Sequence, residues 1–248
     1  MQKVEHIKRD SYKLVEEFSN KTDENPFTKI VPALIKKGLD NVNLSMFSEE
    51  KRNELLNAAA EEYLKRTQVM DALKIFKRTE NKKKLIEVGD EQAKLGVFSY
   101  AIEAYKMAED HPRLLKIGEK CLQEGHLAEA IAAFKRIGEE KKLNDVGDYC
   151  LEKGKVEFAI EVYSALKNKE KLLSLGDQCF TKKELNYAMK AFLLANDEPR
   201  LNKLGEEFMR IGLLSNALRA FEAANNTMMV EFIRENFGDK DLAAKVYV

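Results

Sequence analysis

The sequence predicts an all-α protein built as an array of stacked helical hairpins, and three observations indicate this fold. A 29-residue pattern repeats six times without insertion from Leu56 to Met229. Within each repeat, apolar residues fall at the i, i+3, i+4 and i+7 spacing of two amphipathic helices. The 248 residues include only four Pro and twelve Gly, and 44% are hydrophobic, which is typical of a helix-rich protein.

Four columns define the repeat when positions are counted from its first leucine. Position one is always Leu, position seventeen is always Ala, position five is small and position twenty-one is aromatic. The small residues at position five are Ala60, Gly89, Gly118, Gly147, Gly176 and Gly205, and the aromatics are Phe76, Tyr105, Phe134, Tyr163, Phe192 and Phe221. Because a single hairpin cannot bury its apolar stripe, we expect the repeats to stack into a solenoid.

Glycine at position twelve predicts the turn of each hairpin, since glycine takes the left-handed conformation that ends a helix at no Cβ cost. Gly96, Gly125, Gly154 and Gly212 occupy this position, and Thr67 and Lys183 are the two departures. The glycine at position five lies inside the first helix, where it costs up to about 1 kcal/mol relative to Ala. We expect it to permit close approach of the second helix, whose Ala at position seventeen is equally small. The aromatic at position twenty-one is expected to fill the space between successive hairpins.

A family resemblance follows from these small and aromatic positions. Their order, as in Lys116 to Gly118 followed by Glu129 to Phe134, resembles a tetratricopeptide repeat. The resemblance implies a right-handed α-α superhelix of about six to seven hairpins. The repeat of that family is longer than this one, at about 34 residues. In length the unit is similar to the hairpins of clathrin, coatomer and intraflagellar-transport solenoids.

The two ends of the chain depart from the repeat. Residues 1–55 are expected to form N-terminal capping helices, with a helix over Val4 to Ser19 and a turn from Thr22 to Pro26. They also contain a candidate degenerate unit that starts at Phe27 and keeps Gly38 and Phe47 in register. Residues 230–248 predict a partial seventh repeat, in which Gly238, Ala243 and Tyr247 keep the spacing. The chain is either an excised part of a longer solenoid or ends naturally there.

No catalytic, cofactor or metal site is predicted. Cys121, Cys150 and Cys179 all occupy position eight, and equivalent atoms of stacked units lie about 10 Å or more apart, too far for a disulfide or shared ligation. They are expected to be buried core residues. His6, His111 and His126 have no Cys or Asp at metal or catalytic spacing, so we expect them on the surface. The glycines do not cluster into a phosphate-binding loop.

Charge and hydropathy narrow the class of partner. Lys plus Arg and Asp plus Glu number 42 each, so the net charge is zero and no nucleic-acid partner is expected. The start of the chain carries charges throughout and lacks the apolar run of a signal peptide. No stretch of about 18 apolar residues could span a bilayer, so we expect a cytoplasmic protein without integral membrane contact.

Two charge columns remain. Position six is acidic in every repeat: Glu61, Asp90, Glu119, Asp148, Asp177 and Glu206. Position twenty-nine is basic in five of the six: Lys84, Arg113, Lys142, Lys171 and Arg200. The columns either pair between neighbouring repeats, as exposed ion pairs commonly do, or form part of a binding surface. If the columns pair between neighbouring repeats, we expect Lys142 and Lys171 to form the ion pairs with Asp148 and Asp177.

A candidate binding face follows from the resemblance. In tetratricopeptide proteins the matching face of the first helix lines a concave groove, and the acidic column shares that face with positions two and nine. The candidate residues are Asp90, Glu119, Asn144, Asp148, Leu151, Asp177, Phe180, Asn202, Glu206 and Met209. An acidic row beside apolar side chains would suit a basic amphipathic segment of a protein partner. The peptide-carboxylate clamps of the family use Asn where this chain has Asp or Glu, so the resemblance does not extend to that ligand.

The expected function is a non-catalytic protein–protein interaction scaffold. A more specific alternative is a segment of a vesicle-coat or transport-complex solenoid, which the unit length favours. An RNA-binding helical repeat is opposed by the acidic column and the zero net charge. An enzyme on a helical scaffold would need a separate catalytic domain, and residues 1–55 are too few for one.

Overall fold

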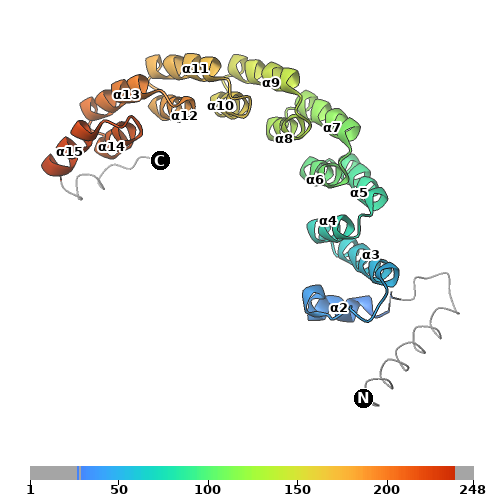
Figure 1. Ribbon diagram of the computed structural model, residues 1–248. Helices are drawn as coiled ribbons and strands as arrows, with labels where there is room; N and C mark the ends of the chain where they lie inside the picture. The colour runs from blue at the N-terminus through green and yellow to red at the C-terminus, as the bar shows by residue number, and fades with distance from the viewer. Residues whose placement is uncertain (1–26, 28, 238–248) are drawn as a thin grey trace. The chain divides into compact units, whose positions relative to one another are not determined.

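The computed structural model describes residues 27 and 29–237, and all regular structure among them is helical. Within this range fourteen α-helices, α2 to α15, follow one another and pack in sequential adjacent pairs (Figure 1). The predicted all-α hairpin array, an α-solenoid, is confirmed. None of the described helices is both long and apolar enough to cross a membrane.

Each repeat contributes two helices. The first helices of the hairpins are α3 (Glu49–Lys65), α5 (Lys82–Lys94), α7 (His111–Gln123), α9 (Glu140–Glu152), α11 (Lys169–Thr181) and α13 (Glu198–Arg210). The second helices are α4 (Val69–Arg78), α6 (Phe98–Ala108), α8 (Leu127–Ile137), α10 (Val156–Ala165), α12 (Leu185–Ala195) and α14 (Leu214–Ala223). A further first helix, α15 (Thr227–Asn236), packs against α14.

The chain divides into two compact units, one that runs to Ile117 and one that begins at Gly118. In the first unit, a core cluster joins Phe76 of α4 with Leu85 and Val88 of α5, so the apolar stripes of neighbouring hairpins share one core. In the second unit, Figure 1 shows α9, α11 and α13 in one row and α10, α12 and α14 in another. Each hairpin of this unit therefore adds one helix to each row.

The hairpin turn at position twelve is confirmed in all six repeats. The four glycines have φ between 67° and 82°, and Thr67 and Lys183 adopt the same left-handed conformation at 61° and 65°. Each turn closes with a backbone hydrogen bond that spans five residues, as from the His126 N–H to the Cys121 carbonyl at 2.8 Å. The backbone conformation of this turn is thus the same in every repeat, although the residue type is not. Thr67 and Lys183 adopt the left-handed conformation in spite of its steric cost for residues with a Cβ.

The turn between hairpins repeats as regularly, and the sequence analysis missed it. Position twenty-five has a positive φ in every repeat, in Glu80, Glu109, Gly138, Lys167, Asn196 and Asn225. The next residue caps the following first helix in most repeats: Asn168, for example, accepts a hydrogen bond from the Lys171 N–H at 3.0 Å. Asn and Asp are favoured at such caps, so the column Asn81, Asp110, Glu139, Asn168, Asp197 and Asn226 was a usable signal.

The glycines at position five let the second helix of their hairpin approach closely, as expected, but the nearest atoms are those of the aromatic ring at position twenty-one rather than of the Ala at position seventeen. A Cβ added to Gly147 would lie 2.7 Å from Cε1 of Tyr163 and 3.0 Å from Cγ1 of Val162. The same ring contact recurs from Gly89 to Gly205. The ring therefore packs within its hairpin as well as in the core that neighbouring hairpins share.

The ends are partly described. Helix α2 (Val31–Lys37) and the left-handed Gly38 occupy the first half of the candidate unit that starts at Phe27. A short 3-10 turn, η1 (Leu39–Asn41), follows, and Phe47 precedes α3, where its ring packs edge-on against that of Phe27 with centroids 6.3 Å apart. The helix expected over Val4 to Ser19, the turn after it, and the Gly238, Ala243 and Tyr247 spacing lie outside the described residues.

Candidate functional site

The acidic and basic columns form a series of ion pairs along the first helices. The pairs are Glu61–Lys84 at 3.2 Å, Asp90–Arg113 at 3.0 Å, Glu119–Lys142 at 2.7 Å, Asp148–Lys171 at 2.7 Å and Asp177–Arg200 at 2.8 Å. We call these five pairs the ion-pair ladder. Each pair joins the middle of one first helix to the first turn of the next, so the ladder links consecutive hairpins.

The register of the pairs differs from the one expected. Asp148 pairs with Lys171 rather than Lys142, and Asp177 pairs with Arg200 rather than Lys171. The reason is that position twenty-nine already belongs to the first turn of the following first helix. The basic side chain at this position can therefore reach back to the acidic residue of the preceding first helix.

The capping residues hold the basic members of the ladder in place. Asp197 accepts hydrogen bonds from the Arg200 N–H at 3.1 Å and from its guanidinium Nη1 at 3.3 Å. The remaining guanidinium nitrogens, Nε and Nη2, donate to the two carboxylate oxygens of Asp177 at 2.8 and 2.9 Å. A bidentate contact of this kind fixes the geometry as well as the charge balance. Asp110 binds Arg113 in the same way.

Tyrosine replaces phenylalanine in two repeats, and its hydroxyl joins the ladder there. Tyr163 donates to Asp148 at 2.7 Å and Tyr105 donates to Asp90 at 2.8 Å. Hydrogen bonds from Lys171 and Tyr163 lower the pKa of Asp148. Partial burial works to raise the pKa of Asp90, but the bonds from Arg113 and Tyr105 outweigh it and the pKa is lowered. Both carboxylates are therefore ionised and already neutralised by an internal partner.

Glu206 is the exception in the acidic column. Met229 takes the place of the basic residue in the last repeat, and Glu206 makes no ion pair with any described residue. Of the predicted acidic site residues, Asp90, Glu119, Asp148 and Asp177 thus belong to the ladder. Only the last residue of the column offers an uncompensated carboxylate.

The asparagines of the candidate face are occupied by local contacts. The Asn144 side-chain amide donates to the Glu140 carbonyl of its own helix at 3.0 Å. The Asn202 amide donates to the Glu198 carbonyl at 3.1 Å, and its oxygen accepts from Asn226 at 2.7 Å. These bonds tie the first helix to the turn that follows the hairpin, so Asn202 has a structural role.

The apolar members of the candidate face are half-buried. Leu151, Phe180 and Met209 lie at the side of their helices, and none is among the exposed large hydrophobic residues. The Phe180 ring is approached by the ammonium groups of Lys183 and Lys203, at 5.7 and 5.3 Å from its centroid. The structure therefore places these residues beside the acidic column but does not gather them into an open apolar patch.

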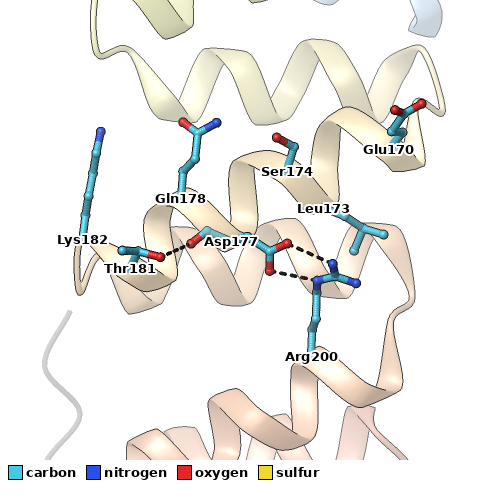
Figure 2. Close-up of a pocket in the computed structure, with 8 residues that line it drawn as sticks. All are labelled: Glu170, Leu173, Ser174, Asp177, Gln178, Thr181, Lys182 and Arg200. Carbon is cyan, nitrogen blue, oxygen red and sulfur yellow. Dashed lines mark hydrogen bonds and ion pairs between the residues drawn. The ribbon is translucent and has the colours of Figure 1, made fainter.

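The face does contain an open hollow centred on α11, which we call the first-helix hollow. Its volume is about 640 Å³, and it is lined by Glu170, Leu173, Ser174, Asp177, Gln178, Thr181, Lys182 and Arg200. Figure 2 shows Arg200 paired with Asp177 on one side of α11, while Ser174 and Gln178 point to the other side. Of this set, sequence analysis found only Asp177 as a site residue and Arg200 as a member of the basic column, because the other side chains differ from repeat to repeat.

A second hollow of about 840 Å³ lies on the other row of helices, between α8, α10 and α12. Phe158 and Leu194 line it, and ion pairs cross it from Lys135 to Glu161 at 3.4 Å and from Lys190 to Glu157 at 3.0 Å. Helix α10 packs directly against both α8 and α12. Second helices of neighbouring hairpins approach more closely than first helices do, so within this unit the first helices form the outer row, and the concave groove that the resemblance implied for their face is not found there (Figure 1).

The three cysteines are buried and unbridged, as predicted. Burial raises the pKa of Cys121 to about 12 and that of Cys179 to about 11, and it also raises the pKa of Cys150. The thiols therefore stay protonated and unreactive at neutral pH. No group of three or more His, Cys, Asp or Glu in the described range could hold a metal ion.

Comparison with known proteins adds no assignment. No family model matches the chain, and no curated protein matches it. The contacts of the described residues are therefore the basis for inferring a function.

Proposed function

We propose that the protein is a non-catalytic, tetratricopeptide-like scaffold that binds a segment of a partner protein on the face formed by its first helices. The observation that carries the proposal is the open hollow on α11, set in a face that the ion-pair ladder holds in register. The ladder fixes one first helix relative to the next. Side chains between its pairs therefore keep a constant spacing, and a bound segment meets a surface that is already organised.

The side chains of the first-helix hollow indicate the chemistry of the partner. Ser174, Gln178 and Thr181 offer hydrogen-bond donors and acceptors, and Leu173 offers an apolar contact. Glu170 lines the hollow and makes no ion pair with any described residue. Asp145, Glu152 and Glu206, which also lie on first helices of this unit, have no ion pair in the described range. These free carboxylates, rather than the ladder, support a basic amphipathic partner segment.

The unit length supports one more specific form of the proposal. The repeat of this chain is similar in length to the hairpins of vesicle-coat and transport-complex solenoids. Under this form the partner would be another subunit of such an assembly. An RNA-binding role has less support, because the first-helix face carries its acidic column outward and the net charge is zero.

Affinity capture with the intact chain, followed by mass spectrometry, tests the proposal. The wild type is compared with a double variant, Glu170→Lys with Leu173→Asp, which reverses the free charge and removes the apolar contact of the hollow. The matched control is Ala128→Lys, an exposed position on α8 outside both the face and the second hollow. We expect specific partners to be lost from the double variant and kept by the control. Equal capture by all three would remove the first-helix hollow as the binding site.

A further inference from the structure

The corner where α4 ends and α5 begins concentrates positive charge in a chain of zero net charge. Residues 74–84, which we call the α4–α5 corner, contain six basic side chains and a single acidic one, Glu80. The basic residues are Lys74, Lys77, Arg78, Lys82, Lys83 and Lys84. The hydrophobic positions of the corner are used by the core, since Phe76 is fully buried and Ile75 is half-buried.

Only part of this charge is compensated within the fold. Lys74 pairs with Asp71 at 3.5 Å, Lys82 with Glu109 at 3.1 Å and Lys84 with Glu61 at 3.2 Å. Lys77 and Lys83 are exposed and make no ion pair with any described residue. They lie on either side of the turn at Thr79 to Asn81, at the end of α4 and the start of α5.

The first turn of α5 carries its charges against the helix dipole. Lys82, Lys83 and Lys84 occupy this turn without an acidic residue, although the amino end of a helix disfavours cations. The corresponding turns of α9, α11 and α13 each contain a glutamate, and that of α7, which also lacks an acidic residue, has a single arginine, Arg113. Three consecutive cations in the first turn thus cost stability in α5 and do not occur in α7, α9, α11 or α13, and such a local departure from the repeat is a sign of function.

We propose that the α4–α5 corner binds an acidic segment of a partner protein. Carboxylates of such a segment would meet Lys77 and Lys83 directly and would add the anion that the first turn of α5 lacks. Two other polyanions fit the corner less well. Single-stranded nucleic acid needs exposed aromatic rings for base stacking, whereas the one aromatic of this segment, Phe76, is buried. The turn itself is polar, with Glu80 at its tip, and offers nothing apolar to insert into a membrane.

The chain contains a matched control for this surface. The corner between α8 and α9 has Lys135, Arg136, Lys141 and Lys142 at the columns of Lys77, Arg78, Lys83 and Lys84. It differs by having Glu139 and Glu140 where the α4–α5 corner has Asn81 and Lys82. Its Lys135 is also paired with Glu161, at 3.4 Å. The same basic columns are thus present there, with Lys135 and Lys142 paired and with two more glutamates beside them.

The test measures binding of a fluorescently labelled oligoglutamate peptide by anisotropy, with the intact chain. We expect the wild type to bind the peptide, and the affinity to fall as salt rises because exposed charges are screened within about 8 Å at physiological ionic strength. The variant Lys77→Glu with Lys83→Glu should bind at least about tenfold more weakly, a loss of about 1.4 kcal/mol. Reversal of the equivalent residues, Lys135→Glu with Lys141→Glu, should leave the affinity unchanged. Far-UV circular dichroism checks that both variants keep the wild-type helicity.

Several results would overturn the proposal. Absence of peptide binding by the wild type is one, and equal weakening by both double variants is another, because the corner would then contribute only general positive charge. A parallel arm uses vesicles with and without phosphatidylserine, and a third uses a labelled single-stranded RNA. If the wild type binds vesicles or RNA through Lys77 and Lys83 but not the peptide, the partner is of that class and not an acidic protein segment.

Discussion

At the scale of single residues, a small residue at position five and an aromatic at position twenty-one form one packing unit. The ring lies so close to the glycine that a Cβ at Gly147 would come within 2.7 Å of the Tyr163 ring. The first repeat has Ala60 with Phe76 at these positions, and both are fully buried there. The same pair of columns therefore accepts a methyl group in one hairpin and excludes it from the others.

Substitution of Gly147 by Ala should destabilise the protein even though Ala is the better helix former. Helix propensity alone would favour Ala by about 1 kcal/mol, but overpacking of a fully buried ring costs about 1–3 kcal/mol. Urea unfolding followed by circular dichroism measures the difference. The control is Ala60→Gly, which should also destabilise, by about 1–2 kcal/mol, because the unfolded chain gains backbone freedom and a buried methyl group is lost. A more stable Gly147→Ala variant would show that the ring is not confined.

Thr67 is the residue at which the hairpin turn costs most. It adopts φ 61° at the position where four repeats have glycine, and a β-branched residue is poorly suited to that conformation. Thr67→Gly should therefore stabilise the protein by about 1 kcal/mol, whereas Gly96→Thr should destabilise it by a similar amount. The midpoints of urea denaturation give both values. Opposite signs to these would mean that the two turns are not equivalent.

At the scale of helices, the sequence predicts which residues form the ion-pair ladder but not which of them pair with each other. The acidic and basic columns identify its members, since their residue types recur once in every repeat that the ladder joins. Their register does not follow from the columns alone, because it depends on where each first helix begins. That boundary lies in the turn at position twenty-five, where Glu80, Gly138 and Lys167 share a backbone conformation but no residue type.

Most side chains that line the first-helix hollow, by contrast, lie at positions whose residue type changes from repeat to repeat. Ser174 and Gln178, for example, occupy columns that hold other residue types in the remaining repeats. A hollow formed by non-repeating side chains between repeating helices can be found only from coordinates. The glycine turns and buried cysteines were predictable for the opposite reason, since glycine recurs at position twelve in four of the six repeats and cysteine at position eight in three consecutive repeats.

Charge reversal at Asp148 tests the register of the ladder. Asp148→Lys removes the bonds from Lys171 and Tyr163 and places two cations together, so stability should fall by about 1 kcal/mol. The second change Lys171→Asp should recover most of the loss, whereas Lys142→Asp should add to it because Lys142 pairs with Glu119. Melting temperatures of the four proteins give the comparison. If Lys142→Asp recovers the stability instead, Asp148 pairs with Lys142 and not with Lys171.

Acid should weaken the contacts of Glu207 only at very low pH. Hydrogen bonds from Arg210 and Lys183 lower the pKa of Glu207 from 4.5 to about 2. A carboxylate whose pKa is depressed on folding stabilises the protein above its unfolded pKa, and the contribution is lost as pH falls through the folded value. The stability difference between wild type and Glu207→Gln should therefore shrink between about pH 4.5 and 2. A difference that is constant over this range would show that Glu207 titrates normally.

At the scale of the whole molecule, neighbouring hairpins contact each other within each compact unit, and the core continues from one repeat to the next. Stability in such an array is close to a sum of repeat and interface contributions. A complete repeat is then removable, provided that the junction keeps the columns in register. A partial repeat is not, because the helices on either side of the junction would present the wrong face to each other.

Deletion of Leu143 to Lys171 tests this claim most directly. It removes one complete repeat and joins Lys142 to Leu172, so position twenty-nine is again followed by position one and the Glu119–Lys142 pair is kept. The comparison is deletion of Leu143 to Ile160, which breaks the register within α10. Circular dichroism should show that the first deletion keeps the helicity per residue and a cooperative, lower melting transition, while the second loses both. Loss of helicity by the in-register deletion to the same extent as the other would contradict the single hairpin repeat as the unit of this protein.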